Sequence, residues 1–87
     1  LGDVYKRQGF YVQLSAQPSE AQARQALRDA SLRYANILSG SRLSIQSAAV
    51  ENRGTFYRVR AEAPSYAEAE QVCSRLQRAG AECFVTR

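Results

Sequence analysis

The chain has 87 residues and a formal net charge of +4, carried by twelve Lys and Arg residues against eight Asp and Glu residues. It has no histidine, which excludes imidazole catalysis and histidine-ligated metals, and no apolar run that approaches the ~20 residues of a membrane span. Eleven of the twelve basic residues are arginine, a bias that favours planar, multidentate recognition over a diffuse positive charge. We therefore expect one small domain, or a piece of a longer chain, with no cofactor, no metal and no direct membrane contact.

Residues 1–8 differ in character from the rest of the chain. The stretch Asp3–Gln8 is what the codons GAT-GTG-TAT-AAG-AGA-CAG encode, and that sequence resembles the transposon mosaic end used to prepare sequencing libraries. We interpret residues 1–8 as an artefactual leader or a native linker, and residues 9–87 as the folded domain.

The first predicted elements are a strand and a helix. Phe10–Ser15 alternates apolar and polar residues, which predicts a β-strand. Its apolar face is expected to carry Phe10, Val12 and Leu14, and its other face Tyr11, Gln13 and Ser15. Ser19 is a good N-cap for a helix whose apolar residues recur at helical spacing. This helix should end between Tyr34 and Ser39, because Gly40 follows.

Two further strands are predicted next. Leu43–Val50 is a weaker strand, and Glu51–Gly54 is a hairpin loop, because Asn and Gly both tolerate positive φ. Gly54–Ala61 is the strongest strand pattern in the chain. Its core face is expected to carry Tyr57, Val59 and Ala61, and its other face Phe56, Arg58 and Arg60.

The last predicted elements are a helix and a short strand. Ser65 should cap the second helix, with Glu68 completing a capping box, and Gly80 should end it. Glu82–Thr86 is the final strand. The order strand–helix–strand occurs twice, and with right-handed crossovers it predicts an α+β fold of the βαββαβ, ferredoxin/RNP-like type. This fold has a four-stranded antiparallel sheet, with both helices on one face and the first and third strands in the centre.

Cys73 and Cys83 are the two cysteines, and their spacing fits no metal motif. They are either two reduced core residues or one disulfide. Both should point into the helix–sheet layer on either side of a tight connection, so a bridge is geometrically reasonable. We expect the disulfide, which is typical of an oxidising compartment.

The helix-free face of the sheet is the candidate binding surface. Its predicted members are Tyr11, Gln13, Ser15, Phe56, Arg58, Arg60, Phe84 and Thr86. Rings beside amide and guanidinium groups suit a sugar or a base, because the ring stacks on the flat side of the ligand while the planar groups bond its polar edges. A plainly solvated polar face is the alternative. We expect Arg58 and Phe56 to act with Gln13 across the strand boundary, and we rank Arg60 last because it lies nearer the strand's end.

Along essentially all of residues 9–87, the chain resembles the SPOR domain family. The resemblance rests on four motifs in order: Tyr11-Val12-Gln13-Leu14, Ser19-Glu20-Ala21-Gln22-Ala23, Gly54-Thr55-Phe56-Tyr57-Arg58-Val59-Arg60, and the run from Ala69 to Gly80 followed by Cys83-Phe84-Val85. The sequence departs from the family pattern at residues 15–17 and 61–64, near the ends of the candidate binding surface.

The resemblance implies a βαββαβ fold, a Cys73–Cys83 disulfide and a peptidoglycan-binding function. It implies a preference for glycan strands stripped of their stem peptides, and a host protein in the bacterial periplasm and cell envelope that is recruited to division septa. By position, it implies ligand contacts from Gln13, Phe56, Arg58 and Phe84. Tyr11, Ser15 and Arg60 complete the predicted glycan-binding set.

Two other functions fit the same topology. RNA-recognition folds stack bases on sheet aromatics, but Arg58 stands where their third-strand motif has an aliphatic residue. A regulatory βαββαβ module would need a polar pocket at the helix starts, where Ser19 and Ser65 serve better as caps. The carboxylates are scattered, with no paired arrangement for catalysis. We therefore predict a non-catalytic, monomeric domain of a larger chain that does not bind nucleic acid.

Overall fold

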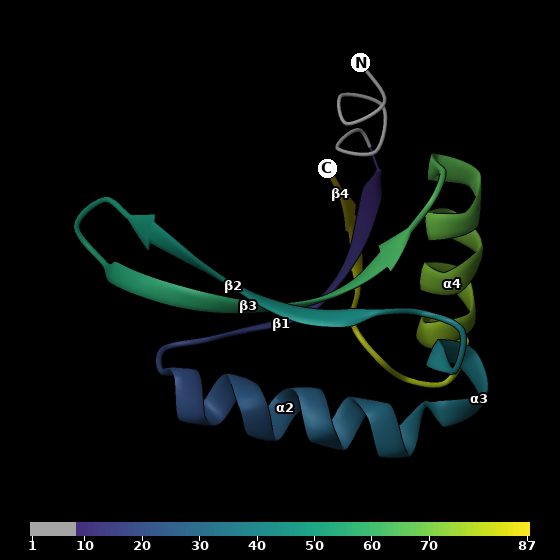
Figure 1. Cartoon of the computed structure of the whole chain (residues 1–87), viewed down its shortest axis with the longest axis horizontal. Coiled ribbons are helices and arrows are strands. Elements are labelled where there is room, and N and C mark those ends of the chain that lie inside the picture. The colour runs from purple at the N-terminus through teal and green to yellow at the C-terminus, as the bar shows by residue number, and fades with distance from the viewer. Residues whose placement is uncertain (1–8) are drawn as a thin grey trace.

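The computed structural model describes residues 9–87, so the prediction for residues 1–8 lies outside it. The elements are β1 (Phe10–Gln17), α2 (Glu20–Arg33), α3 (Ala35–Leu38), β2 (Leu43–Val50), β3 (Gly54–Ala63), α4 (Tyr66–Arg78) and β4 (Phe84–Thr86). The four strands form one antiparallel sheet in the order β2-β3-β1-β4 (Figure 1). The predicted α+β fold, with the first and third strands in the centre, is confirmed.

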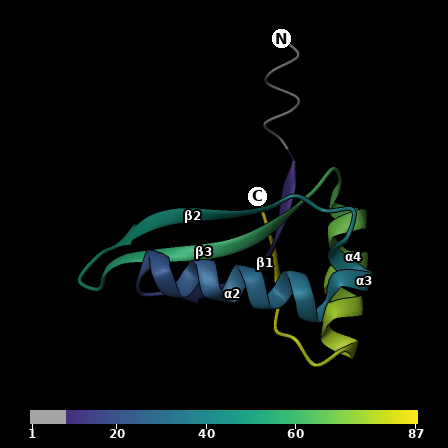
Figure 2. The ribbon, with the colours of Figure 1, turned by 60° about the horizontal axis from the view of Figure 1, so that its bottom comes forward.

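The helices cover one face of the sheet and leave the other face open. α2 packs against β1, β2 and β3, while α4 packs against β1, β3 and β4. Figures 1 and 2 show both long helices on the same side of the strands, so the domain has two layers. The layer between them is the core, where Val12, Val59 and Leu76 are fully buried.

The first predicted helix is two helices in the structure. Tyr34 leaves helical geometry, with φ −115° and ψ 33°, although its N–H still donates to the carbonyl of Ala30 at 2.9 Å. The short α3 then follows and contacts α4. This break turns the chain so that Leu38, which is only 4% exposed, enters the core. An unbroken helix could not have made that turn.

Both long helices begin at the serines that the sequence indicated. The Oγ of Ser19 accepts the N–H of Gln22 at 3.2 Å, and the Oγ of Ser65 accepts the N–H of Glu68 at 3.2 Å. Each bond satisfies one of the backbone donors left free in a first helical turn. Gly80, at φ 95°, ends α4 in the left-handed region that glycine adopts at little cost.

A disulfide joins α4 to the chain just before β4. Cys73 and Cys83 are bonded, with their Cα atoms 5.7 Å apart, and both are less than a tenth exposed. The predicted bridge is therefore present. Regular β4 pairing begins at Phe84, two residues later than predicted, because the chain leaving Gly80 is first held at the bridge.

β1 carries a β-bulge that changes the face of its second half. Gln13 lies opposite Arg60, whereas Ser15 lies opposite Val59, so Leu14 is the extra residue. Opposite residues in an antiparallel pair point to the same face, and Val59 is fully buried. Ser15 therefore faces the helix layer, where its Oγ is buried and has no hydrogen-bond partner in residues 9–87. The expectation that Ser15 belongs to the helix-free face is wrong, because alternation breaks at the bulge.

Candidate binding face

The helix-free side of the sheet, called the open face below, carries a continuous set of polar and aromatic side chains. Its members follow from the strand register and from alternation with the buried residues: Tyr11, Gln13 and Ala16 on β1, Ser44, Gln46 and Ala48 on β2, Phe56, Arg58, Arg60 and Glu62 on β3, and Phe84 and Thr86 on β4. Among the predicted residues, all except Ser15 lie on this face.

Four of these residues form a row across all four strands, called the central row below. It reads Ser44, Arg60, Gln13, Phe84 from β2 to β4. Gln13 on β1 thus lies between Arg60 on one side and Phe84 on the other. Phe84 is 64% exposed, so its ring is free to meet a ligand.

Arg58 does not pair with Gln13, contrary to the expected arrangement. It lies in the next row, between Gln46 and Ala16. Arg60, which was ranked last, is the direct neighbour of Gln13. The sequence pattern indicated the correct face for both arginines, but the register that decides their neighbours depends on the bulge and on strands longer than predicted.

Arg60 and Tyr11 form a stacked pair at the centre of the open face. The Cζ atom of Arg60 lies 3.7 Å from the centroid of the Tyr11 ring, which is cation–π geometry. The Nε atom of Arg60 is buried and has no hydrogen-bond partner among the described residues. The guanidinium is therefore held in a fixed orientation while part of its donor capacity remains unused.

Phe56 lies away from the central row. It pairs with Ala48 near the turn of the β2–β3 hairpin, four residues before Arg60 and roughly 13 Å from it along the strand. The hairpin extends beyond the rest of the sheet in Figure 1. Phe56 and Phe84 are thus separate aromatic contacts, and a ligand that meets both must be extended.

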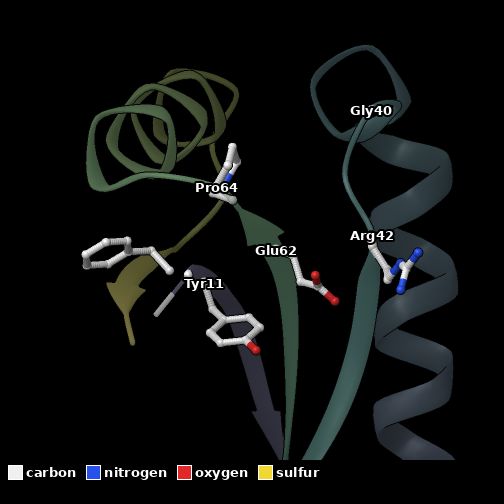
Figure 3. A pocket seen from close by; sticks show the side chains of 8 residues that line it. Tyr11, Gly40, Arg42, Glu62 and Pro64 are labelled. Carbon is white, nitrogen blue, oxygen red and sulfur yellow. The ribbon is translucent and has the colours of Figure 1, made fainter. Parts of the chain in front are cut away.

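A pocket of about 480 Å³ lies at the end of the open face where β3 ends and β2 begins. Figure 3 shows Tyr11, Glu62 and Arg42 beside one another around it, from three adjacent chain segments. The N–H of Glu62 donates to the carbonyl of Arg42 at 2.9 Å, which fixes the two backbones. Glu62 and Arg42 are not among the residues predicted from the sequence. Glu62 lies two residues after Arg60 and therefore on the same face of the strand. It could have been predicted if the strand had been extended past Ala61.

Phe10 belongs to a separate aromatic cluster on the helix side. Its ring meets the ring of Tyr66 edge-on, with centroids 5.6 Å apart, and the Cζ atom of Arg87 lies 5.2 Å from the Phe10 ring. A hydrogen bond to Glu70 and the negative charge of that residue raise the pKa of Tyr66 above its ordinary value. This cluster links β1 to α4, and Phe10 also lines the pocket at the end of the open face.

The side chains of the described residues are suited to binding a ligand. In residues 9–87 no group of three or more His, Cys, Asp or Glu residues is placed to hold a metal ion. In the same range, no helix has the length and apolar character needed to cross a membrane. The open face itself presents planar hydrogen-bonding groups and rings.

Comparisons with known proteins agree on one family. The family model described as "SPOR domain" matches residues 6–87. The crystal structure of the RlpA SPOR domain from Pseudomonas aeruginosa is similar, with a TM-score of 0.62 and 22% sequence identity, covering 91% of this chain and 99% of that one. The solution structure of the peptidoglycan binding domain of the B. subtilis cell wall lytic enzyme CwlC has a TM-score of 0.60 and 22% identity, covering 88% of this chain and 86% of that one. A search of curated proteins found no match. The match over residues 6–87 and the shared fold lead to one conclusion: this chain belongs to the SPOR domain family.

Proposed function

We propose that this domain is a non-catalytic module that binds the glycan strands of peptidoglycan on its open face. The observation that carries the proposal is the stack of Arg60 on Tyr11, next to Gln13 and Phe84 in the central row. Aromatic rings stack on the apolar faces of sugars, while amide and guanidinium groups bond hydroxyl and acetamido edges. Membership of the SPOR family and the CwlC peptidoglycan binding domain as a structural neighbour support this choice of polymer.

The shape of the face favours glycan strands without stem peptides. From Phe56 to Glu62 the open face follows β3 for roughly 20 Å, so the ligand is an extended chain. A stem peptide on every second sugar would hold the strand away from the side chains of the open face. Removal of the peptide also frees the lactyl carboxylate of that sugar, to which Arg58 and Arg60 can donate charge-assisted hydrogen bonds.

We further propose a location in the bacterial cell envelope, with recruitment of the host protein to division septa. The Cys73–Cys83 disulfide supports an oxidising compartment such as the periplasm. Septal recruitment follows if peptide-free strands are enriched at septa. A periplasmic fusion of the domain to a fluorescent protein should collect at septa, and the same fusion carrying Gln13→Ala and Arg60→Ala should spread evenly around the envelope.

The test of binding is sedimentation with purified sacculi, before and after an amidase has removed the stem peptides. The wild-type domain should sediment mainly with amidase-treated sacculi. Gln13→Ala and Arg60→Ala should each weaken sedimentation at least tenfold, and Arg58→Ala should weaken it less. Arg28→Ala on the exposed side of α2 is the matched control, because it removes the same charge away from the open face.

Two results would overturn the proposal. Unchanged sedimentation of both Gln13→Ala and Arg60→Ala would show that the open face is not the site. Equal sedimentation with intact and amidase-treated sacculi would remove the preference for peptide-free strands. Single-stranded RNA added as a competitor should have no effect, and its success as a competitor would favour the RNA-recognition alternative.

A further inference from the structure

The outer edge of β2 is the longest free strand edge in the part of the chain that the structure describes. β2 pairs with β3 through all eight of its residues, from Leu43 opposite Ala61 to Val50 opposite Gly54, with no shift in register. Within residues 9–87, no strand pairs with its other edge, because β2 is the first strand in the sheet order. Figure 2 shows no element alongside that edge. The edge strand on the other side, β4, has three residues.

β2 lacks the features that usually stop an edge strand from pairing with another chain. Such strands are commonly protected by charged side chains, by proline, by a bulge or by being short. The β2 sequence LSIQSAAV contains no charge and no proline, and its pairing is regular. The strand thus offers unpaired backbone N–H and C=O groups over roughly 26 Å. The one bulge of the sheet lies on β1, which is central.

We propose that β2 pairs antiparallel with β2 of a second copy of this chain. The charges at its ends select this occupant and this direction. Arg42 precedes the strand and Glu51 follows it. Antiparallel self-pairing brings the Arg42 end of one copy beside the Glu51 end of the other, whereas a parallel arrangement would place like charges together. Leu43 and Ile45, which are only half-buried in one copy, gain apolar cover on the helix side.

The proposed contact closes on itself. Antiparallel pairing of identical strands is isologous, so it uses the β2 edge of both copies and stops at a dimer with one eight-stranded sheet. The two-fold axis runs perpendicular to the sheet, which keeps the helices of both copies on one side and both open faces on the other. This inference goes beyond the proposed function and does not depend on it. It differs from the prediction of a monomeric domain, and the oligomeric state decides between the two.

The register of the dimer places Ser47 at the axis or next to it. Opposite residues must share a face, so the axis passes through Gln46 or through Ser47. With the axis at Gln46, Ser47 lies opposite Ile45 of the second copy. With the axis at Ser47, it lies opposite Ser47 of the second copy. Ser47 is exposed in the single copy, where it pairs with Tyr57. A charge at Ser47 therefore lies directly or diagonally opposite the same charge in the second copy, without disturbing an ion pair of the single copy.

The experiment is sedimentation equilibrium of residues 1–87 at concentrations up to about 1 mM, where weak dimers form. The wild-type chain should approach twice the monomer mass. Ser47→Glu and Ser47→Lys should each stay monomeric, because like charges lie directly or diagonally opposite each other at the centre of the contact. An equimolar mixture of the two variants should recover the dimer, and added salt should weaken it. Ser74→Glu and Ser74→Lys on the exposed side of α4 are the matched controls and should dimerise like the wild type.

A wild-type chain that remains monomeric at this concentration, or Ser47 variants that dimerise separately, would overturn the inference. Species larger than a dimer would also overturn it, because the contact is closed. If the variants do not fold, amide hydrogen exchange of the wild type decides the matter. Protection of residues 43–50 should then rise with protein concentration, and protection independent of concentration contradicts the proposal.

Discussion

At the scale of single residues, the open face depends on the orientation of one guanidinium. Arg60 stacks on Tyr11 and lies opposite Gln13, whereas Arg58 is exposed in the neighbouring row. A planar cation held against a ring loses little conformational freedom when it binds a ligand. The geometry and planarity of Arg60 should therefore matter as much as its positive charge.

This argument predicts that Arg60→Lys does not rescue binding. Lysine keeps the charge but presents a flexible ammonium that cannot hold the same planar stack. We expect Arg60→Lys to bind amidase-treated sacculi at least fivefold more weakly than the wild type, with a melting temperature within a few degrees. The measurement is quantitative sedimentation beside a thermal melt. Wild-type affinity in Arg60→Lys would mean that charge alone is recognised.

Ser15 gives a second prediction at this scale. Its Oγ is buried on the helix side with no partner among the residues that the structure describes, so its removal ends a desolvation cost while the cavity there grows only slightly. Ser15→Ala should leave the free energy of unfolding unchanged or raise it by up to about 1 kcal/mol. Sacculus binding should stay at the wild-type level. Denaturant unfolding checks the first statement, and a tenfold loss of binding would contradict the second.

Residue-scale prediction from the sequence succeeded where strict alternation holds and failed where it breaks. Tyr11, Gln13, Phe56 and Phe84 all lie on the face that alternation indicated. Ser15 does not, because the bulge inserts one residue and no glycine or proline marks it in the sequence. The residue opposite Gln13 could not be predicted either. It depends on the strand register, whereas alternation gives only the face on which a side chain lies.

At the scale of elements, helix starts were predictable because their chemistry is local. Ser19 and Ser65 accept the N–H groups three residues ahead, and both act within four residues of sequence. The break at Tyr34 has no such local signature. It is imposed by the need to place Leu38 in the core, which is a contact with distant parts of the chain.

The cap of α4 should be worth a measurable part of the stability. Ser65→Ala removes the acceptor for the N–H of Glu68 and should lower the free energy of unfolding by about 1 kcal/mol. In a domain of this size, such a loss lowers the melting temperature by roughly 4–8 °C. Ser74→Ala in the exposed middle of α4 is the control and should have almost no effect. Equal melting temperatures for the wild type and Ser65→Ala would show that the cap bond is not formed.

At the scale of the whole molecule, a thin core is tied by one covalent bridge. The fully buried large side chains are Val12, Val59 and Leu76, and alanines supply much of the rest. A domain this small buries a limited share of its surface, so a cross-link contributes a large part of its stability. Topology and bridge could both be predicted, because element order and right-handed crossovers leave few alternatives.

Reduction of the disulfide should therefore destabilise the domain strongly. A closed loop with a sequence separation of 10 predicts a loss of about 2.5–3 kcal/mol in the free energy of unfolding. The melting temperature in reductant should fall by more than 10 °C. Thiol titration of the unreduced, unfolded chain should detect no free thiol. Two free thiols, or a melt that does not respond to reductant, would contradict this prediction.

The position of the bridge also determines how the domain responds to a pulling force. Tyr11 lies opposite Thr86, so the beginning of β1 and the end of β4 are adjacent. A force that separates these two ends would open the β1–β4 hydrogen bonds one after another, which is the mechanically weak direction. Peeling stops after the three residues of β4, because Cys83 is tied to Cys73 on α4 and the load then passes to a covalent bond. At the C-terminal end, the disulfide thus keeps the loop between Cys73 and Cys83 from being extended and passes the load to the packing of α4.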